Sequence, residues 1–467
     1  MKSFMSDNFL LDNPTAEELY SAVRDLPVFD YHCHLSPEEI YRDRAFYNLT
    51  QLWLECDHYK WRVMRNAGVD ERYITGDASD YDKFLAFAKV LPDFAGNPVY
   101  QWAHLELKKY FGITTPLSED TANEIWEKTL GVMSDGGFSA RRLIARSGVD
   151  TVITTDDPTD ELKFHELLQK EDLPFAVLPC FRPDNAINID KDGFCDYIAK
   201  LSSASGINIV SVDILCDALA ARLDYFVAHG AVAADCSFKN FASGDDCDAA
   251  AEKAFAKKIN GEKPSAEECS EFSFAVTKRL AAMFRERGLV MQIHTGVLRN
   301  QNTTRFAAIG ADCGIDSVGN CVDVEAAGRL FDAVEKEGGI PKTIVYTLNP
   351  ASYYPLATML GNFAGESRGK MQLGAAWWFL DHSDGIREQL AVFAATAGIG
   401  HFNGMLTDSR SFVSYARHDY FRRVLCSVLG KMAEDGEYPT GEPLRRLAQN
   451  ISYYNAKNYF VGGGNKK

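Results

Sequence analysis

Two histidines, His32 and His34, are separated by a single residue near the start of the chain. In an extended strand, residues two apart point to the same side, so both imidazoles would project together. Pro37 follows closely and is expected to end the strand. Because neutral imidazoles bind divalent metals, the pair predicts one side of a metal site. Histidines also fall this close by chance, so the interpretation needs a ligand from elsewhere.

Two residues far along the chain are candidates for the rest of that site. His294 follows the apolar run 289–293, and Asp408 follows the run 404–407. Taken singly, His294 fits a buried core histidine and Asp408 fits a helix cap. Together with His32 and His34 they favour one divalent metal, for which we expect zinc, with an open coordination position for chemistry. The run 343–346 is followed by Thr347–Asn349 and not by a histidine, so we expect no second metal.

Two arginines form a second group with chemical potential. Arg182 follows the run 175–178, and Arg410 lies two residues beyond Asp408. The guanidinium fork binds carboxylates through two hydrogen bonds, so the pair indicates an anionic substrate. The alternative is an internal ion pair with Asp184 or Asp408.

Eight short apolar runs would position these side chains. They alternate with helical stretches and cover 28–31, 151–154, 175–178, 231–234, 289–293, 343–346, 371–374 and 404–407. Such runs are typical of parallel strands buried on both faces. Eight of them predict an α/β fold of the (β/α)8 TIM-barrel type, although an open doubly wound sheet alternates in the same way. The barrel is favoured because polar residues follow nearly every run, where a barrel has its active site.

The order of the patterns predicts three regions. Residues 1–36 hold a helix, begun by a capping box at Thr15–Glu18, and the first barrel strand. Residues 37–147 are helical in pattern and read as a helical insertion domain. Residues 148–467 hold the remainder of the barrel, with long loops expected at 238–288 and 296–323.

Composition excludes several classes of protein. The 467 residues carry a net charge of −16 and are 46% hydrophobic, which argues against nucleic-acid binding and against disorder. We find no apolar stretch of the ~20 residues that a membrane span needs, and no signal peptide in residues 1–18. The eleven cysteines include no Cys-x-x-Cys pair. This pattern fits reduced thiols, and we expect a cytoplasmic protein.

The chain closely resembles the uronate isomerases, the glucuronate/galacturonate isomerase family of the amidohydrolase superfamily. The matching stretches are Phe29–Leu35, Asp57–Lys60, Cys180–Asp184, Gln292–Gly296, Leu298–Asn300, Trp377–Phe379, Gly404–Phe412 and Tyr415–Arg423. They span nearly the whole chain in the expected order. One departure is Cys236, which stands where the family commonly has a histidine.

The resemblance implies an aldose–ketose isomerase of hexuronate catabolism. Its substrates would be D-glucuronate and D-galacturonate, converted to D-fructuronate and D-tagaturonate by ring opening and proton transfer through an enediol. A homo-oligomer is also expected. The metal is not necessarily required for turnover, since an enediol route can run on protein acids and bases alone.

The resemblance also implies roles for individual residues. Catalysis would involve Asp408 in ring opening, and His58 with Tyr59 in proton transfer, with the Tyr59 phenolate favoured by Arg410. Taken alone, His58 and Tyr59 fit a helix surface. The residues expected to contact substrate are Arg182, Arg410, His294, Trp377, Trp378 and Asp235.

Two other functions share these residues. A metal-dependent hydrolase or deaminase would use Asp408 to take a proton from metal-bound water. A catalytically silent sugar-acid binding protein would keep the pocket without turnover.

Overall fold

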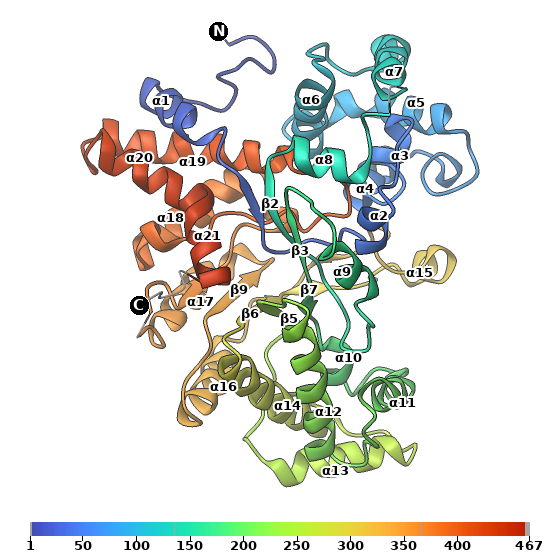
Figure 1. Cartoon of the computed structure of the whole chain (residues 1–467), viewed down its shortest axis with the longest axis vertical. Helices are drawn as coiled ribbons and strands as arrows, with labels where there is room; N and C mark the ends of the chain where they lie inside the picture. Colours follow the sequence, from blue (N-terminus) through green and yellow to red (C-terminus); the bar gives the residue numbers. More distant parts are fainter. Residues whose placement is uncertain (1, 135, 366, 463–467) are drawn as a thin grey trace.

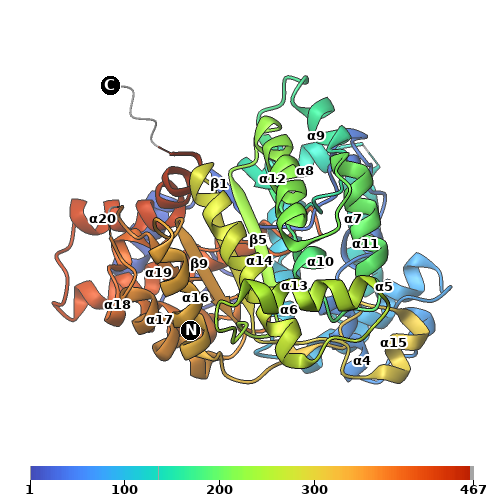
Figure 2. The same ribbon diagram turned by 90° about the horizontal axis from the view of Figure 1, so that it is seen from below.

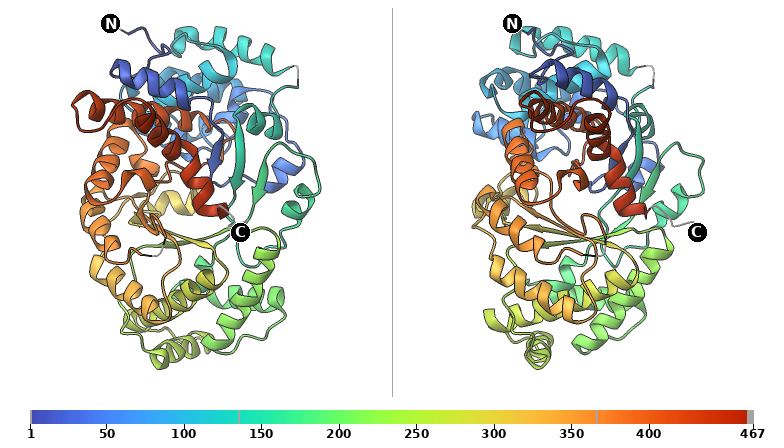
Figure 3. Two further views of the ribbon diagram at one scale, coloured as in Figure 1. Left: turned by 60° about the vertical axis from the view of Figure 1, so that its left-hand side comes forward. Right: turned by 90° about the vertical axis from the view of Figure 1, so that its left-hand side faces the viewer.

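The computed structural model describes residues 2–134, 136–365 and 367–462. Parallel strands occupy the centre and helices surround them (Figure 1, Figure 3). The strands form two neighbouring sheets, with orders β1-β2-β3 and β10-β9-β6-β5-β4. Their bounds are β1 Val28–Asp30, β2 Val149–Ile153, β3 Ala176–Leu178, β4 Cys180–Phe181, β5 Ala233–Phe238, β6 Val290–Thr295, β9 Thr343–Thr347 and β10 Met371–Leu373.

The two sheets are joined through one stretch of chain. Strand β3 pairs with β2, and β4, which begins two residues later, pairs with β5. Pro179 separates the two strands, and proline has no N–H to donate to a ladder. Residues 176–181 therefore act as a single interrupted barrel strand.

The segment 404–409 closes the ring without forming a regular strand. The Thr407 N–H donates to Oδ1 of Asp30, and the Asp408 N–H donates to the His32 carbonyl. The His34 N–H in turn donates to the Ser409 carbonyl. The predicted eighth strand is thus wrong as a regular strand, because side-chain and single backbone bonds replace a ladder, but the segment lies where that strand was expected, beside β1.

Helices cover the outside of the strands. They include α1 Pro14–Val23, α9 Lys163–Leu168, α11 Phe194–Ser205, α12 Val212–Ala228, α14 Ala266–Glu286, α16 Val324–Lys336, α17 Tyr353–Gly361, α18 Ser383–Thr396 and α19 Ala416–Glu434. Figure 2 shows α12, α14 and α16 running along the outside of the strands. Helix α16 buries Ala327, Leu330 and Val334, which lie on one face at helical spacing.

Helices also fill the stretch between β1 and β2, as its pattern predicted. They are α2 Pro37–Tyr41, α3 Leu49–Trp53, α4 His58–Asn66, α5 Asp80–Val90, α6 Pro98–Phe111, α7 Glu119–Met133 and α8 Ala140–Arg146. This group lies together at one end of the molecule (Figure 1). It brings α4 to the edge of the barrel.

The prediction of a long loop at 238–288 is wrong. This stretch contains α13 Asp248–Ile259 and α14, and α14 begins at a capping box between Ser265 and Glu268. Residues 296–323 are more irregular, with a small hairpin of β7 Val297–Leu298 and β8 Ser317–Val318, and α15 Thr303–Ile309 between them.

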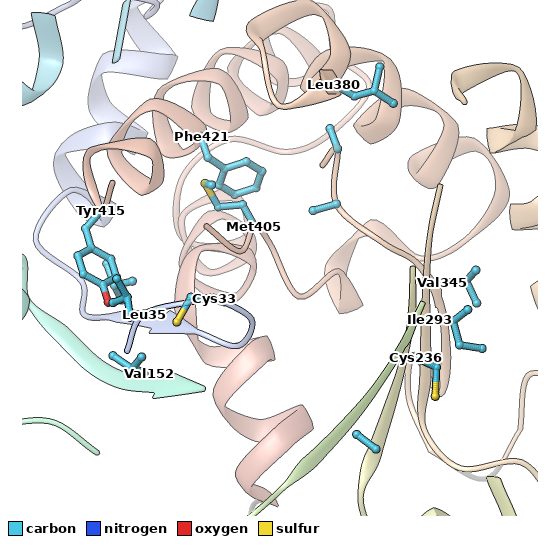
Figure 4. Close-up of a cluster of buried hydrophobic side chains, with 14 of the residues drawn as sticks. Cys33, Leu35, Val152, Cys236, Ile293, Val345, Leu380, Met405, Tyr415 and Phe421 are labelled. Atoms are coloured by element: carbon cyan, nitrogen blue, oxygen red, sulfur yellow. The ribbon is translucent and has the colours of Figure 1, made fainter. Parts of the chain in front are cut away.

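Strand alternation separates the core from the barrel interior. Cys236, Ile293 and Val345 are in register on β5, β6 and β9 and lie on the same side of these strands (Figure 4). Their neighbours Asp235 and His294 therefore face the interior. Cys236 is fully buried in the hydrophobic core. The departure from the family pattern is thus directed away from the site.

The structure leaves all eleven cysteines free. Among the residues that the structure describes, no helix combines the length and the apolar character needed to cross a membrane.

Candidate active site

A cavity of about 360 Å³ lies where the barrel strands end. Its lining includes most of the residues that the sequence singled out: His32, His34, His58, Arg182, His294, Trp377, Trp378, Asp408 and Arg410. These residues come from segments up to 378 positions apart, so the fold brings the predicted set together. Two predicted residues, Tyr59 and Asp235, are not among the described residues that line it.

Two of the predicted metal donors, His32 and His34, meet at Asp408. Its Oδ1 lies 3.2 Å from His32 Nε2 and 3.1 Å from His34 Nε2. Burial lowers the pKa of His34 to about 4, so its imidazole is neutral and able to bind a metal. Trp377 Nε1 donates to the other carboxylate oxygen at 2.6 Å, which fixes the orientation of the carboxylate. The donor atoms of the three residues lie within 4.8 Å of one another, a spacing that fits a single ion.

His294 and Asp235 form a supporting pair on neighbouring strands. His294 Nδ1 lies 2.7 Å from Asp235 Oδ1, and its Nε2 is buried without a hydrogen-bond partner. A carboxylate on one ring nitrogen leaves the other free to meet a metal or substrate. Asp235 is fully buried and also lies 3.1 Å from Arg182 NH1. The geometry does not support a substrate contact for Asp235, which instead orients His294 and Arg182.

The two predicted arginines differ in their partners. Arg182 pairs with Asp184 at 2.9 Å as well as with Asp235, so two carboxylates already neutralise its charge. Arg410 pairs with Asp312 at 3.0 Å and not with Asp408. Both side chains of that pair are partly exposed, which leaves Arg410 available to an incoming anion.

His58 and Tyr59 begin helix α4, whose N-cap is Asp57. Their rings stack at 4.9 Å, with His58 lining the cavity and Tyr59 lying in an adjoining one. The Tyr59 hydroxyl is buried without a partner. Burial raises the pKa of Tyr59 well above its usual value.

The expectation of a Tyr59 phenolate beside Arg410 is therefore wrong. The guanidinium next to the Tyr59 ring, at 4.7 Å, belongs to Arg417. Its charge is balanced by Asp57 and Asp381, each 3.9 Å away. With that charge compensated, burial dominates and the phenol keeps its proton.

Several residues of the cavity are not predictable from the residue pattern alone. Arg299 lies over the Trp378 ring at 5.1 Å and pairs with Asp316 at 3.0 Å. Its signal was present in the family stretch Leu298–Asn300. Other lining residues not proposed as site residues are Thr155, Asp156, Asp157, Asp184, Asn185, Lys191, Ser237 and Asp312. Most of these follow barrel strands, the position in which a barrel places its site.

Comparison with known proteins identifies the family. The model of the glucuronate isomerase family matches residues 1–460. The chain belongs to this family. It is 49% identical to the uronate isomerase of Caldanaerobacter subterraneus subsp. tengcongensis, over 98% of this chain and 99% of that protein. It is 47% identical to the uronate isomerase of Clostridium perfringens, over 98% and 100%.

Solved structures of the glucuronate isomerase family have the same fold. The uronate isomerase of Thermotoga maritima superposes with a TM-score of 0.93 at 33% identity, covering 98% of this chain and 100% of that one. The glucuronate isomerase of Caulobacter crescentus gives 0.91 at 26%, covering 99% and 98%. The TIM-type barrel and the predicted enzyme class, an aldose–ketose isomerase of uronates, are thereby confirmed.

Proposed function

We propose that the cavity at the strand ends converts an aldose hexuronate to its ketose, with D-glucuronate and D-galacturonate as substrates. The observation that carries the proposal is the meeting, in one cavity, of a metal-donor set, acid–base groups and arginines. Each is needed: the sugar ring must open, a proton must move from C2 to C1, and the carboxylate must be held.

His32, His34 and Asp408 would hold one divalent metal, and zinc suits their donor atoms. His294, whose Nε2 is unpartnered, adjoins this set and would be a fourth ligand or a contact to substrate. When bound, the metal would polarise a substrate oxygen and stabilise negative charge on it. The donor set fits this role because His34 is neutral and Asp408 is fixed by Trp377.

Asp408 would take the proton of the sugar's anomeric hydroxyl and return it to the ring oxygen as the C1–O5 bond breaks. His58 then acts on the opened chain, since it lines the cavity and burial lowers its pKa, which keeps it a neutral base. Tyr59, stacked behind His58, keeps its proton and holds the imidazole in position. The His58 imidazole moves the proton between C2 and C1.

Arg410 is the proposed carboxylate ligand, because Asp312, with which it pairs, is half-exposed. Arg182 already pairs with Asp184 and Asp235, and its contact with Asp235 stabilises the edge of the cavity. Trp377 and Trp378 form an apolar wall against one face of the sugar. We further propose that the protein works in the cytoplasm, as its free thiols suggest, and as a homo-oligomer.

The direct test incubates the purified protein with each uronate in D₂O and follows ketose formation by NMR. Ketose with deuterium at the accepting carbon is the expected product of an enediol route. A second sample is treated with a chelator and then supplied with zinc. Activity lost and recovered in this sample supports a metal in the site, whereas full activity under chelation limits the metal to another role. No ketose from either sugar contradicts the proposal.

A further inference from the structure

A second cavity lies beside helix α9, behind the wall of the active-site cavity. It has a volume of about 510 Å³. Among the described residues that line the two cavities, Asp156 is common to both. Asp156 follows strand β2 and is 7% exposed. Its carboxyl group therefore separates the site from this second cavity.

A chain of hydrogen bonds runs outward from Asp156. The Thr154 hydroxyl donates to Asp156 Oδ2 at 2.7 Å and lies 2.8 Å from His165 Nε2. His165, on α9, lines the second cavity. Thr154 is fully buried and His165 is 2% exposed. The three groups thus make a continuous path through the barrel wall, with the hydroxyl at its centre.

The path is held in place by the backbone around it. The Cys180 N–H donates to Asp156 Oδ2 at 3.1 Å. The Leu178 carbonyl lies 3.2 Å from the Thr154 hydroxyl and gives it a second acceptor. The hydroxyl can therefore turn between two acceptors without losing a hydrogen bond.

The electrostatic surroundings allow Asp156 to gain and lose a proton near neutral pH. Burial raises the pKa of Asp156 to about 7, and the nearby Asp160 carboxylate adds to the effect. Burial lowers the pKa of His165 to about 4. The charged and titratable groups around the path include Asp157 and Asp160 on the same loop, Cys33, Cys180, Arg182 and His229, and, in the second cavity, Glu38, Glu161, Lys163 and Lys200.

We propose that Asp156, Thr154 and His165 form a proton relay between the active-site cavity and the solvent of the second cavity. In the inward direction, His165 gains a proton from water at Nδ1 and releases the one on Nε2 to Thr154. Thr154 passes its own proton to Asp156 Oδ2. One positive charge moves inward, and only N–H and O–H bonds are made and broken. Reversal moves a proton out.

This inference rests on the proposed isomerisation and assigns to the relay the exchange of the transferred proton with solvent. The proton that leaves C2 either returns to C1 or is replaced from solvent while it resides on the protein. The relay provides a route for that replacement. Thr154 and His165 do not line the active-site cavity among the described residues, so they act through Asp156.

The test uses uronate carrying deuterium at C2, in H₂O. The quantity measured is the fraction of label lost to solvent per ketose formed. Thr154→Val keeps the shape of the side chain and removes the hydroxyl, and Thr154→Ser is the matched control that retains it. We expect label loss in the T154V protein to fall on the order of tenfold with KM unchanged, and T154S to resemble the parent.

The fraction of label lost per ketose distinguishes loss of the relay from structural damage. A merely distorted enzyme forms ketose more slowly but loses the same fraction of label. Parental label loss in T154V, equal effects in T154V and T154S, or full label retention by the parent each overturn the relay. If T154V does not fold, His165→Gln breaks the path at its outer end and decides the question in the same way. Absence of ketose from the parent contradicts the proposed function itself, a separate and recognisable result.

Discussion

At the scale of single residues, two arginines near the site have opposite surroundings. Arg417 is 1% exposed and lies between Asp57 and Asp381, whereas Arg410 pairs with a half-exposed Asp312. Removing one partner from a buried ion cluster leaves charges uncompensated, while a partly exposed pair contributes little to stability. The same kind of substitution therefore has different consequences at the two positions.

We expect Arg417→Met to lower the free energy of unfolding by roughly 3–5 kcal/mol, because the buried Asp381 loses its cation and Asp57 is left with Lys60 alone. Arg410→Met should change it by less than about 1 kcal/mol. The larger effect on kcat/KM is expected for R410M. Its kcat/KM should fall on the order of 10–100-fold, because a charged hydrogen bond to the substrate carboxylate is lost. Denaturant titration and steady-state kinetics on both proteins make the comparison. An unstable R410M with normal kcat/KM would show that Arg410 is structural.

The residue types and spacing predicted that His32 and His34 would lie beside Asp408, and the structure brings the three together, although β1 ends at Asp30, before the two histidines. Their role as metal donors stays a prediction. The residue types and spacing did not predict which cation lies beside Tyr59. Arg410 is nearer in the sequence motif to the other site residues, but Arg417 comes from the start of α19 and reaches Tyr59 only after that helix packs against α6. A contact of this kind depends on helix packing and has no periodic signal in the sequence.

At the scale of elements, close packing at the end of β10 supports His294. A Cβ on Gly374 would lie 2.1 Å from the Tyr346 ring. That ring stacks on His294 with centroids 4.5 Å apart, and its hydroxyl donates to Gln292 at 2.8 Å. Any side chain at position 374 must therefore displace the ring on which His294 rests.

Gly374→Ala is expected to destabilise the protein by about 1–3 kcal/mol through overpacking and to lower kcat by moving His294. Gly328→Ala provides the control, because Gly328 lies inside α16 with nothing within 4 Å of an added Cβ. Alanine there should stabilise by about 0.5–1 kcal/mol and leave kcat unchanged. Thermal unfolding and kinetics test both. Equal stability of G374A and the parent would mean that the Tyr346 ring has room to move.

Most of the barrel was predictable from sequence because buried parallel strands are short apolar runs. Two parts were not. The stretch 404–409 is apolar enough to suggest a strand, but Gly404 has a φ of +72° and Asp408 one of +45°, so the chain turns too sharply for a ladder. Helix α14 lies where a loop is expected from the sequence. Phe272, Val276 and Leu280 follow at helical spacing, but the surrounding polar residues obscure that pattern.

At the scale of the whole molecule, metal binding should couple to stability. A ligand that binds only the native state stabilises it by about 2.7 kcal/mol at a concentration 100 times its Kd. We expect zinc to raise the Tm of metal-free protein, and Asp408→Asn to reduce the shift because the shared carboxylate of the donor set is lost. Calorimetry needs no substrate for this measurement. An equal shift in D408N would place the metal elsewhere.

Stability should also depend on pH through Glu106, which is 1% exposed on α6. Burial raises the pKa of Glu106 from 4.5 to about 7, so the native state binds more protons than the unfolded chain between these values. Native stability therefore falls as pH rises through that window and levels off above it.

Glu106→Gln removes this titration. Relative to the parent, the free energy of unfolding of the variant should rise by roughly 1–3 kcal/mol between pH 4.5 and pH 7. Above pH 7 the difference between the two proteins should stay constant. Glu119→Gln, at an exposed pair with Lys89, should show no such trend. Unfolding by urea at a series of pH values gives the comparison. A parallel offset at every pH would assign the effect to packing and not to ionisation.

The pairing of β1 with segment 404–409 has a consequence for biosynthesis. His32 and His34 leave the ribosome early, but Asp408 and the backbone groups that fix His34 come from the last part of the chain. A nascent chain holds only two of the three proposed donors until residue 408 has been translated. Capture of the proposed metal by all three would therefore follow closure of the barrel, and a product terminated before residue 408 would lack the completed site.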